Sequence, residues 1–281
     1  TGIFRVEING QTIPDLYMPC WSNYNKYIDV CEYDIAELIG KDNAISVTVA
    51  NGWYSGKLGY GNKTNVFGDT KRLFAEIEIV YKDGEKEKIE TDDSWNVRVS
   101  EVVFADFFDG EIIDARRFID NEKPAYKAIN CDFKVPFAAY DREPVRVVDM
   151  IKPKVIYSDE KTVRYDFGVN FAGNIRVKAK GASGNAIIAK YAEMLRENGE
   201  LYTENLRRAK CCDKFILSGG CDTFEPSFTY HGFRYAELQK DADTAITDVQ
   251  GLVISQNIEY YGGFECSDKT INGIYKMAWN G

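Results

Sequence analysis

Apolar and polar residues alternate along most of this chain, and this period of two is the feature that most restricts its fold. In the ranges 4–8 and 45–49, every second residue is apolar. Because successive side chains of a β-strand point to opposite faces of a sheet, each range predicts a strand with one buried face. The 18 Tyr and 16 Phe residues suit such strands, since aromatic side chains pack well on a pleated surface. The sequence therefore predicts a mainly β protein.

A first β-sandwich is expected over residues 1–120. Its clearest element is a hairpin, in which the alternating segment 75–81 and the segment 87–90 flank the turn Asp83-Gly84. One short helix is predicted at 34–39, with Asp34 as its cap, Glu37 three residues later and Gly40 at its end.

A second β-sandwich is expected over residues 146–256, after a linker at 121–145 that several prolines interrupt. Short strands separated by Gly-rich turns are typical of such sandwiches. The strands predicted in this block are 163–167, 174–180, 186–192, 213–217, 224–228, 234–239 and 249–254.

Residues 257–281 are expected to form a connector and the beginning of a helix. Ser267 is a suitable N-cap, Asp268 places negative charge in the first turn, and apolar residues then recur at helical spacing. At the other end, the segment 1–8 reads as a strand entered partway, without an initiator Met or a leader. These features predict a piece of a larger protein.

The composition disfavours several classes of function. A formal net charge of −9 argues against binding to nucleic-acid backbones, which attract basic surfaces. No apolar run approaches the roughly 18–20 residues that span a bilayer, so no membrane partner is expected.

The seven cysteines, at positions 20, 31, 131, 211, 212, 221 and 266, are odd in number and form no Cys-x-x-Cys motif. We therefore expect reduced, buried thiols and a cytoplasmic location, without disulfides or structural zinc.

His231 is the one histidine of the chain, so it is the only imidazole available as a general base. It stands in an aromatic segment, Thr229-Tyr230-His231-Gly232-Phe233-Arg234-Tyr235. A hydrogen-bonded structural role at a domain junction is favoured over a catalytic role, and a histidine-rich metal site is excluded.

Carboxylates gather between residues 106 and 114, where Asp106, Asp109 and Glu111 are the candidates for chemistry. An inverting glycosidase needs two carboxyl groups roughly 6.5–9.5 Å apart. A loop that binds sugar or calcium is an alternative, although the spacing differs from that of an EF-hand. Since Asp109-Gly110 is an ordinary turn signal, solvated acids around a turn are a third interpretation.

Residues 50–61 follow a predicted strand and combine aromatic side chains with several glycines. Such rings can stack on the C–H face of a sugar while Asn and Tyr supply hydrogen bonds. A Trp that closes the end of a sandwich core is an equally good interpretation. No catalytic or metal-binding residue is assigned, and the candidate carbohydrate-binding residues are Asn51, Trp53, Tyr54, Asp109 and Glu111.

Seven short motifs occur in order along nearly the whole chain. They are Gly52-Trp53-Tyr54, Phe108-Asp109-Gly110-Glu111, Tyr165-Asp166-Phe167-Gly168, Ala192-Glu193-Met194-Leu195, Asn205-Leu206-Arg207, His231-Gly232-Phe233-Arg234-Tyr235 and Gly263-Phe264-Glu265-Cys266-Ser267-Asp268. Together they resemble the bacterial α-L-rhamnosidases of glycoside hydrolase family 78, and in the same order.

This resemblance implies a jelly-roll or galactose-binding-like first domain and a concanavalin-like second one. It also implies that the last helix opens an (α/α)6 catalytic barrel, whose acidic residues lie beyond this chain. Some family members bind rhamnose through calcium, with an Asp-Asn pair before the Gly-Trp motif. Here Asn51 matches but Ala50 replaces the acidic residue, and alanine cannot ligate calcium, so no cofactor is expected.

Three functions remain open at this point. The first, favoured by the resemblance, is the non-catalytic N-terminal part of an inverting α-L-rhamnosidase-like hydrolase, with the catalytic domain and a rhamnoside or related glycan as partners. The second is a free-standing module that binds rhamnose or a related sugar. The third is a small enzyme that uses Asp106, Asp109 or Glu111.

Overall fold

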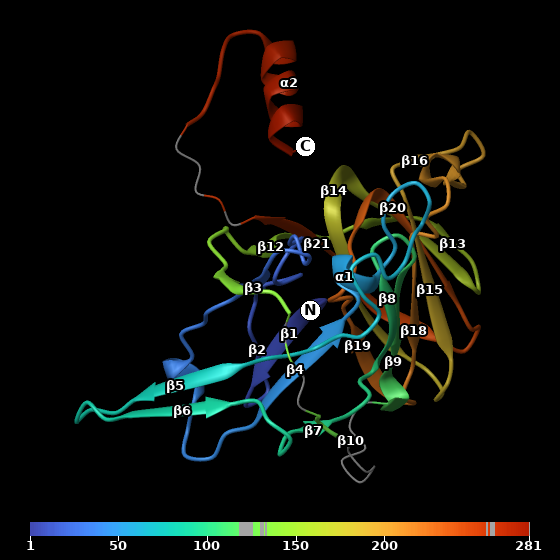
Figure 1. The fold of residues 1–281 in the computed structure, drawn as a ribbon. Helices are drawn as coiled ribbons and strands as arrows, with labels where there is room; N and C mark the ends of the chain where they lie inside the picture. Colours follow the sequence, from blue (N-terminus) through green and yellow to red (C-terminus); the bar gives the residue numbers. More distant parts are fainter. Residues whose placement is uncertain (118–125, 130–131, 133, 257, 259–261, 281) are drawn as a thin grey trace.

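The computed structural model describes residues 1–117, 126–129, 132, 134–256, 258 and 262–280. Within these residues the chain consists mainly of β-strands, with short helical turns between them and one longer helix near the C-terminal end (Figure 1). The predicted mainly β class is confirmed.

A large curled sheet dominates the structure and contains ten strands of the described chain. In spatial order its main path runs β12 (Val145–Ile151), β21 (Ala245–Gln256), β14 (Thr162–Lys180), β20 (His231–Lys240), β15 (Ala186–Ala192), β18 (Cys212–Ile216), β9 (Gly110–Asp114) and β8 (Val102–Asp106). Two further strands, β13 (Lys154–Ser158) and β19 (Cys221–Phe224), pair with β14 outside this path. The neighbours pair antiparallel except β9, which lies parallel to β18.

The main hydrophobic core is built from alternate residues of the central strands of this sheet. In β15, for example, Ile187, Ala189 and Tyr191 are buried while Ile188 and Lys190 are partly exposed. Burial of a large apolar side chain contributes roughly 1.5–3 kcal/mol. Because the buried side chains alternate along each strand, most of the stabilisation from apolar burial arises on one face of the sheet.

The structure merges two predicted strands into one. The ranges 163–167 and 174–180 both belong to β14, which continues through Gly168 at a φ of +83°. A glycine with positive φ usually marks a turn or a bulge, and here it lies where the pairing with β20 is irregular. The register with β20 shifts between Asp166 and Phe171. Pairing with β21 from Gly173 onward then holds the second half of the strand in the same sheet.

A smaller sheet lies at the N-terminal end of the chain (Figure 1). Its three described strands run in the order β2 (Gln11–Thr12), β1 (Ile3–Ile8) and β4 (Ile45–Ala50). The strands predicted at 4–8 and 45–49 are thereby confirmed. A second core cluster, which includes Ile3, Phe228 and Ile254, joins this sheet to the large one.

Four two-stranded ladders lie around these sheets in the described chain. They are β3 (Ile28–Val30) with β11 (Phe137–Ala139), β5 (Glu76–Val80) with β6 (Lys86–Glu90), β7 (Asn96–Val97) with β10 (Tyr126–Lys127), and β16 (Met194–Leu195) with β17 (Leu201–Tyr202). The β5–β6 pair is the predicted hairpin, and Gly84 takes a φ of +91° in its turn.

The helix predicted at 34–39 is wrong in type and length. The structure has a single 3-10 turn there, η1 (Ala36–Leu38), without a side-chain cap at its preceding residue. Asp34 still accepts the backbone N–H of Ala36 at 3.0 Å. Six residues form too few hydrogen bonds to offset the cost of starting an α-helix, so the segment stops after one turn. The other single turns are α1 (Gly52–Ser55), η2 (Ala115–Arg117) and η3 (Glu204–Leu206).

The strand predicted at 224–228 is also wrong, because β19 ends at Phe224. Pro226 has no N–H to donate to a ladder. The N–H groups of Ser227 and Phe228 donate instead to the Glu111 carboxylate, at 3.1 and 2.7 Å. A side chain that is distant in sequence thus takes the place of a strand partner.

The last element, α2 (Lys269–Asn280), extends away from the β-structure (Figure 1). Asp268 Oδ1 accepts the N–H groups of Thr270 and Ile271 at 2.8 and 3.3 Å. The predicted helix is confirmed, but Asp268 caps it rather than Ser267. No helix in the described ranges is both apolar and long enough to cross a membrane.

All six described cysteines are free thiols, and Cys131 lies outside the described residues. Only Cys211 is buried, whereas Cys221 is exposed and the others are partly exposed. The predicted burial of the thiols is therefore wrong for most of them, and the predicted cellular location stays a prediction. The division of the chain at 121–145 also stays a prediction.

Candidate functional site

Two segments that are far apart in sequence meet at the predicted carbohydrate-binding residues. The segment 51–57 follows β4, and the segment 105–109 includes the turn between β8 and β9. The Asn51 amide donates to the carbonyl oxygen of Ala105 at 3.3 Å. The Lys57 backbone N–H donates to Asp106 Oδ2 at 2.8 Å. These contacts join the two segments into one surface.

The turn α1 positions Trp53 and Tyr54 because Gly52 adopts a conformation that other residues avoid. Gly52 has a φ of +50°, and a Cβ at this position would lie 2.6 Å from Ile3 Cγ2. Glycine is therefore required both for the backbone conformation and for the close approach to β1. The chain can then leave β4 and begin α1 without a connecting loop.

Trp53 and Tyr54 have different environments. Tyr54 is buried and packs edge-on against Tyr24, with the ring centroids 5.3 Å apart. Trp53 is partly exposed, and its ring centroid lies 4.3 Å from that of Phe107. Of these two residues, Tyr54 contributes to packing and only Trp53 keeps part of its ring open to solvent. A stacking role for Trp53 stays a prediction.

Asp109 and Glu111 are held by different partners. Asp109 Oδ2 lies 2.6 Å from Lys57 Nζ and 3.4 Å from Lys210 Nζ. Although burial opposes ionisation, these two lysines hold the pKa of the Asp109 carboxyl below its usual value. For Glu111, burial is the main cause that raises the pKa, to about 8, and the charge of Asp213 acts in the same direction. The Asp109 carboxyl is thus an ion-pair partner, and the Glu111 carboxyl is largely protonated at neutral pH.

The side chains around Asn51 do not fit a calcium ion. Asn51 Oδ1 accepts hydrogen bonds from Ser55 Oγ at 3.2 Å and from Lys71 Nζ at 3.0 Å. An ammonium group therefore already occupies the oxygen that would face the ion. Within the described ranges, no group of three or more His, Cys, Asp or Glu side chains is placed to hold a metal. Together with Ala50, this arrangement disfavours calcium.

His231 lies at the centre of a buried polar cluster. Its Nε2 is 3.2 Å from both carboxylate oxygens of Asp213, and its Nδ1 is 3.3 Å from Cys211 Sγ. Tyr191 stacks on the imidazole with ring centroids 4.3 Å apart and donates its hydroxyl proton to Asp213 Oδ2 at 2.5 Å. Burial alone lowers the pKa of His231, but the charge and hydrogen bond of Asp213 raise it to about 10. At neutral pH the ring is cationic, so both nitrogens donate.

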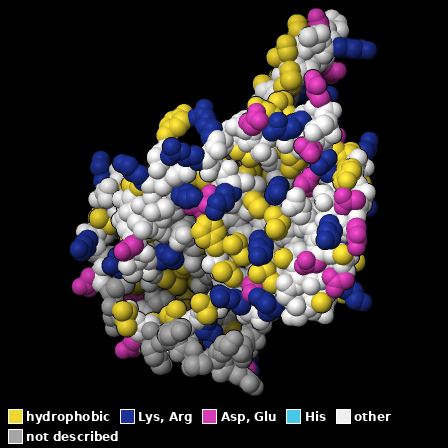
Figure 2. All heavy atoms as spheres, turned by 90° about the vertical axis from the view of Figure 1, so that its right-hand side faces the viewer, with side chains coloured by type: hydrophobic (Ala, Val, Ile, Leu, Met, Phe, Trp, Pro, Cys, Tyr) yellow, Lys and Arg dark blue, Asp and Glu magenta, His cyan; other side chains and the backbone are white. Residues whose placement is uncertain are grey.

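This cluster is closed to solvent, since His231 is 2% and Asp213 is 0% exposed. No imidazole is visible on the face drawn in Figure 2, where charged groups of both signs and hydrophobic groups are mixed. The predicted hydrogen bonding of His231 is confirmed, whereas its predicted position at a domain junction stays a prediction.

Two family profiles match the chain in tandem. The α-L-rhamnosidase N-terminal domain matches residues 1–166, and the bacterial α-L-rhamnosidase concanavalin-like domain matches residues 156–255. The chain belongs to the α-L-rhamnosidase family. Both matches lie in the order that the sequence motifs imply.

Several α-L-rhamnosidases are similar to nearly the whole chain. The enzyme of Streptomyces avermitilis is 30% identical over 99% of this chain and 28% of its own length. The crystal structure of an Aspergillus terreus α-L-rhamnosidase matches with a TM-score of 0.90 and 33% identity, over 99% of this chain and 34% of that one. The Streptomyces avermitilis α-L-rhamnosidase complexed with L-rhamnose matches with a TM-score of 0.89 and 29% identity, over 98% of this chain and 28% of that one. The chain therefore spans about a third of the length of these relatives.

The carboxylates of this α-L-rhamnosidase region anchor turns and ion pairs. Asp106 Oδ1 accepts the N–H groups of Phe108 and Asp109 at 2.9 and 3.2 Å. Asp114 is bound by the Arg116 guanidinium at 2.8 Å. Asp109 Oδ1 and Glu111 Oε1 lack partners among the described residues, but both atoms are buried. A small enzyme that uses Asp106, Asp109 or Glu111 stays a prediction.

Three residues that hold Asp109 or Glu111 in place were not predicted from the sequence. They are Lys57, Lys210 and Asp213. No sequence motif marks the two lysines, because each comes close to Asp109 only in the folded protein. Asp213 does have a signal, since it shares a strand face with Phe215 and Leu217, which are all 0% exposed. A carboxylate on a fully apolar strand face indicates a buried partner, and the one histidine is a suitable one.

Proposed function

We propose that this chain is the N-terminal, non-catalytic region of an α-L-rhamnosidase, and that its β-structure packs against a catalytic domain of the same protein. The tandem match carries the proposal, since residues 1–166 and 156–255 match the N-terminal and concanavalin-like regions of that family. The whole protein hydrolyses terminal α-L-rhamnosides with inversion, and its two catalytic carboxyl groups are supplied from outside this chain.

Two further observations support this proposal. The side chains with the most chemical potential, His231 and Asp213, are sealed in a structural cluster. A relative that is 29% identical has been crystallised with L-rhamnose, which supports a carbohydrate as the ligand. We place the protein in a reducing, cytoplasmic compartment, and the free thiols of the described cysteines support this location.

Hydrolysis of para-nitrophenyl α-L-rhamnoside tests the proposal. The whole protein that contains this chain is compared with residues 1–281 alone, and para-nitrophenyl β-D-glucoside serves as the control substrate. We expect the whole protein to release nitrophenolate from the rhamnoside only, and the 281-residue chain to match the rate in buffer. Proton NMR of the first product should show β-L-rhamnose, as inversion requires. Hydrolysis by the chain alone, or a whole protein inert toward the rhamnoside, would contradict the proposal.

A further inference from the structure

A cavity of about 570 Å³ lies between the N-terminal sheet and the edge of the large sheet. Four parts of the chain form its walls, from the ranges 5–16, 101–115, 146–147 and 223–227. Its volume falls within the roughly 300–1,000 Å³ of ligand pockets, which often form where two packed units meet. Among the candidate carbohydrate-binding residues, only Glu111 lines this cavity. It is therefore distinct from the surface around Trp53.

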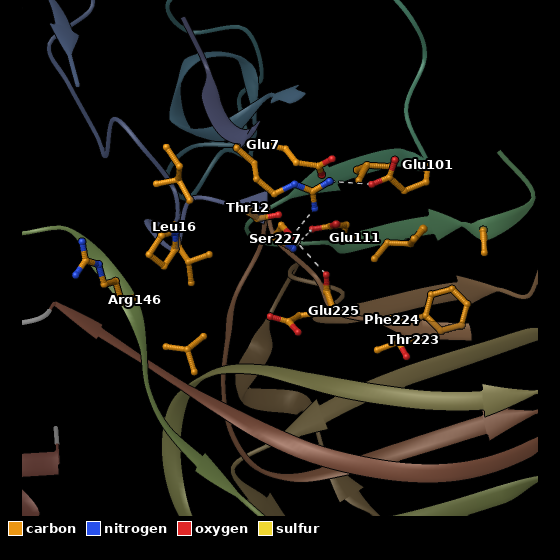
Figure 3. A pocket seen from close by; sticks show the side chains of 17 residues that line it. Glu7, Thr12, Leu16, Glu101, Glu111, Arg146, Thr223, Phe224, Glu225 and Ser227 are labelled. Atoms are coloured by element: carbon orange, nitrogen blue, oxygen red, sulfur yellow. Dashed lines mark hydrogen bonds and ion pairs between the residues drawn. The ribbon is translucent and has the colours of Figure 1, made fainter. Parts of the chain in front are cut away.

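Glu111 has an unused hydrogen-bonding atom in this cavity. Its Oε2 accepts the N–H groups of Ser227 and Phe228, whereas Oε1 is buried with no partner among the described residues. Figure 3 shows Glu111 beside Ser227, with Glu7 and Glu101 nearby. Burial raises the pKa of Glu111 to about 8, and because Oε2 already accepts two N–H groups, the proton belongs on Oε1. A buried O–H without an acceptor is costly, and a ligand oxygen would supply the acceptor.

The charges that line the cavity are largely paired. The ion pairs are Arg5–Glu101, Arg146–Asp15 and Glu225–Arg176, with N···O distances of 2.9, 2.6 and 2.7 Å. A phosphate or carboxylate ligand would meet guanidinium groups that already hold a carboxylate. A divalent cation would need several oxygen ligands, and the described residues hold no such group. The cavity is therefore suited to a neutral ligand.

The remaining walls are both apolar and hydroxyl-bearing. Leu16 and Val102 supply apolar surface, while Thr12 and Thr223 supply hydroxyl groups. A sugar has the same two properties, because hydroxyl groups surround a ring whose faces carry C–H groups. Arg5 is also fixed in place, since its Nη1 donates to Ser227 Oγ at 3.0 Å.

We propose that this cavity binds a neutral saccharide of one or two rings, which hydrogen-bonds to Glu111 and Arg5 and packs against Leu16 and Val102. The choice of a saccharide rests on the proposed function, whereas the presence of a binding site rests on the cavity alone. Bound there, the sugar contacts strands of both sheets.

Titration calorimetry on residues 1–281 tests the proposal with L-rhamnose, D-galactose and D-galacturonate as probes. We expect millimolar binding of a neutral sugar and weaker binding of the uronate, because Glu7 and Glu101 repel its carboxylate. Thr12→Trp and Thr223→Trp introduce bulky rings at exposed positions of two walls. Both variants should weaken binding at least tenfold. The matched control, Thr247→Trp, changes an exposed strand threonine outside the cavity and should leave binding unchanged.

Methyl NMR of the unmodified chain gives a second readout that needs no variant. Addition of the neutral sugar should shift the signals of Ile13, Leu16 and Ile113, which line the cavity. No heat with either neutral sugar, binding that survives both tryptophan substitutions in folded protein, or shifts confined to residues near Trp53 would overturn the proposal. Such a result would leave the hydrolysis test unaffected, because that test measures the whole protein.

Discussion

Replacement of Asp213 by Asn is expected to destabilise this protein by about 3–5 kcal/mol at neutral pH, because it leaves a buried imidazolium without its counter-charge. Asp213 is fully buried and accepts hydrogen bonds from the Tyr191 hydroxyl, the Glu111 N–H and His231. Asparagine preserves the shape but replaces one accepting oxygen with an NH₂ group. At least one of these donors then loses its acceptor as well.

The size of the histidine contribution follows from its pKa. The pKa of His231 rises from 6.5 to about 10, and at about 1.4 kcal/mol per unit this corresponds to roughly 5 kcal/mol. Because the pKa in the folded protein is raised, the stabilisation is fully present below pH 6.5 and is lost as the pH rises through 10. Between pH 6 and pH 9 the free energy of unfolding of the wild-type protein should therefore fall by roughly 3 kcal/mol. The variant lacks this contribution of the ion pair at both pH values.

Two measurements check this expectation. Urea unfolding gives the free energy of unfolding of both proteins at pH 6 and at pH 9. The difference between wild type and Asp213→Asn should be about 3 kcal/mol smaller at pH 9 than at pH 6. Because the charge of Asp213 also raises the pKa of Glu111, both proteins are measured with Glu111→Gln in the background, so that the difference between them reports on the histidine. Proton NMR can follow the imidazole directly, since His231 is the only histidine.

Asp166→Asn is the matched control. Asp166 pairs with Arg234 at 2.8 Å, but both side chains are partly exposed, so its loss should cost less than about 1 kcal/mol and leave the imidazole titration unchanged. The reasoning is refuted if His231 titrates near pH 6.5 in the wild type. It is equally refuted if wild type and Asp213→Asn lose the same stability between pH 6 and pH 9.

Three further outcomes are expected. Because burial raises the pKa of Glu111 to about 8, this residue makes the wild type lose stability as pH rises from 4.5 through 8, in addition to the loss that His231 causes above pH 6.5; Glu111→Gln should make the total loss in urea unfolding smaller, and an unchanged loss would contradict the assignment. Gly52→Ala should lower the free energy of unfolding by about 2–3 kcal/mol, whereas Gly40→Ala, which meets open space, should change it little. Millimolar calcium should leave the Tm unchanged, because Lys71 occupies Asn51 Oδ1, and a calcium-dependent rise in Tm would show that the ion binds.

Most strand positions were predictable because the burial of alternate side chains is a local property of the sequence. The segments 4–8, 45–49 and 186–192 show this most clearly, and all three are strands. The two errors in strand limits have a common cause. The continuation of β14 depends on pairing with β21, and the end of β19 depends on Glu111, which lies more than a hundred residues away in sequence.

The candidate site was predictable in its residue types but not in its connections. The motif at 52–54 and the carboxylates at 106–111 do lie together, because Lys57 bonds to Asp106 and Asp109. The difference in exposure between Tyr54, which is buried, and Trp53, which is partly exposed, could not be predicted from the sequence. That distinction arises from the orientation of α1 on β1, which a close contact at Gly52 sets.

Strands from the first expected block complete the large sheet of the second. β9 lies parallel to β18 and β8 pairs with β9, so residues before the expected linker cover an edge of that sheet. Glu111 on β9 also supplies the acceptor for the Ser227 and Phe228 N–H groups. Without these strands, β18 would present unpaired backbone groups, which favour aggregation, and two N–H groups would lose their acceptor. The regions matched by the two family profiles therefore depend on each other for stability, and a ligand in the cavity between them would stabilise both together.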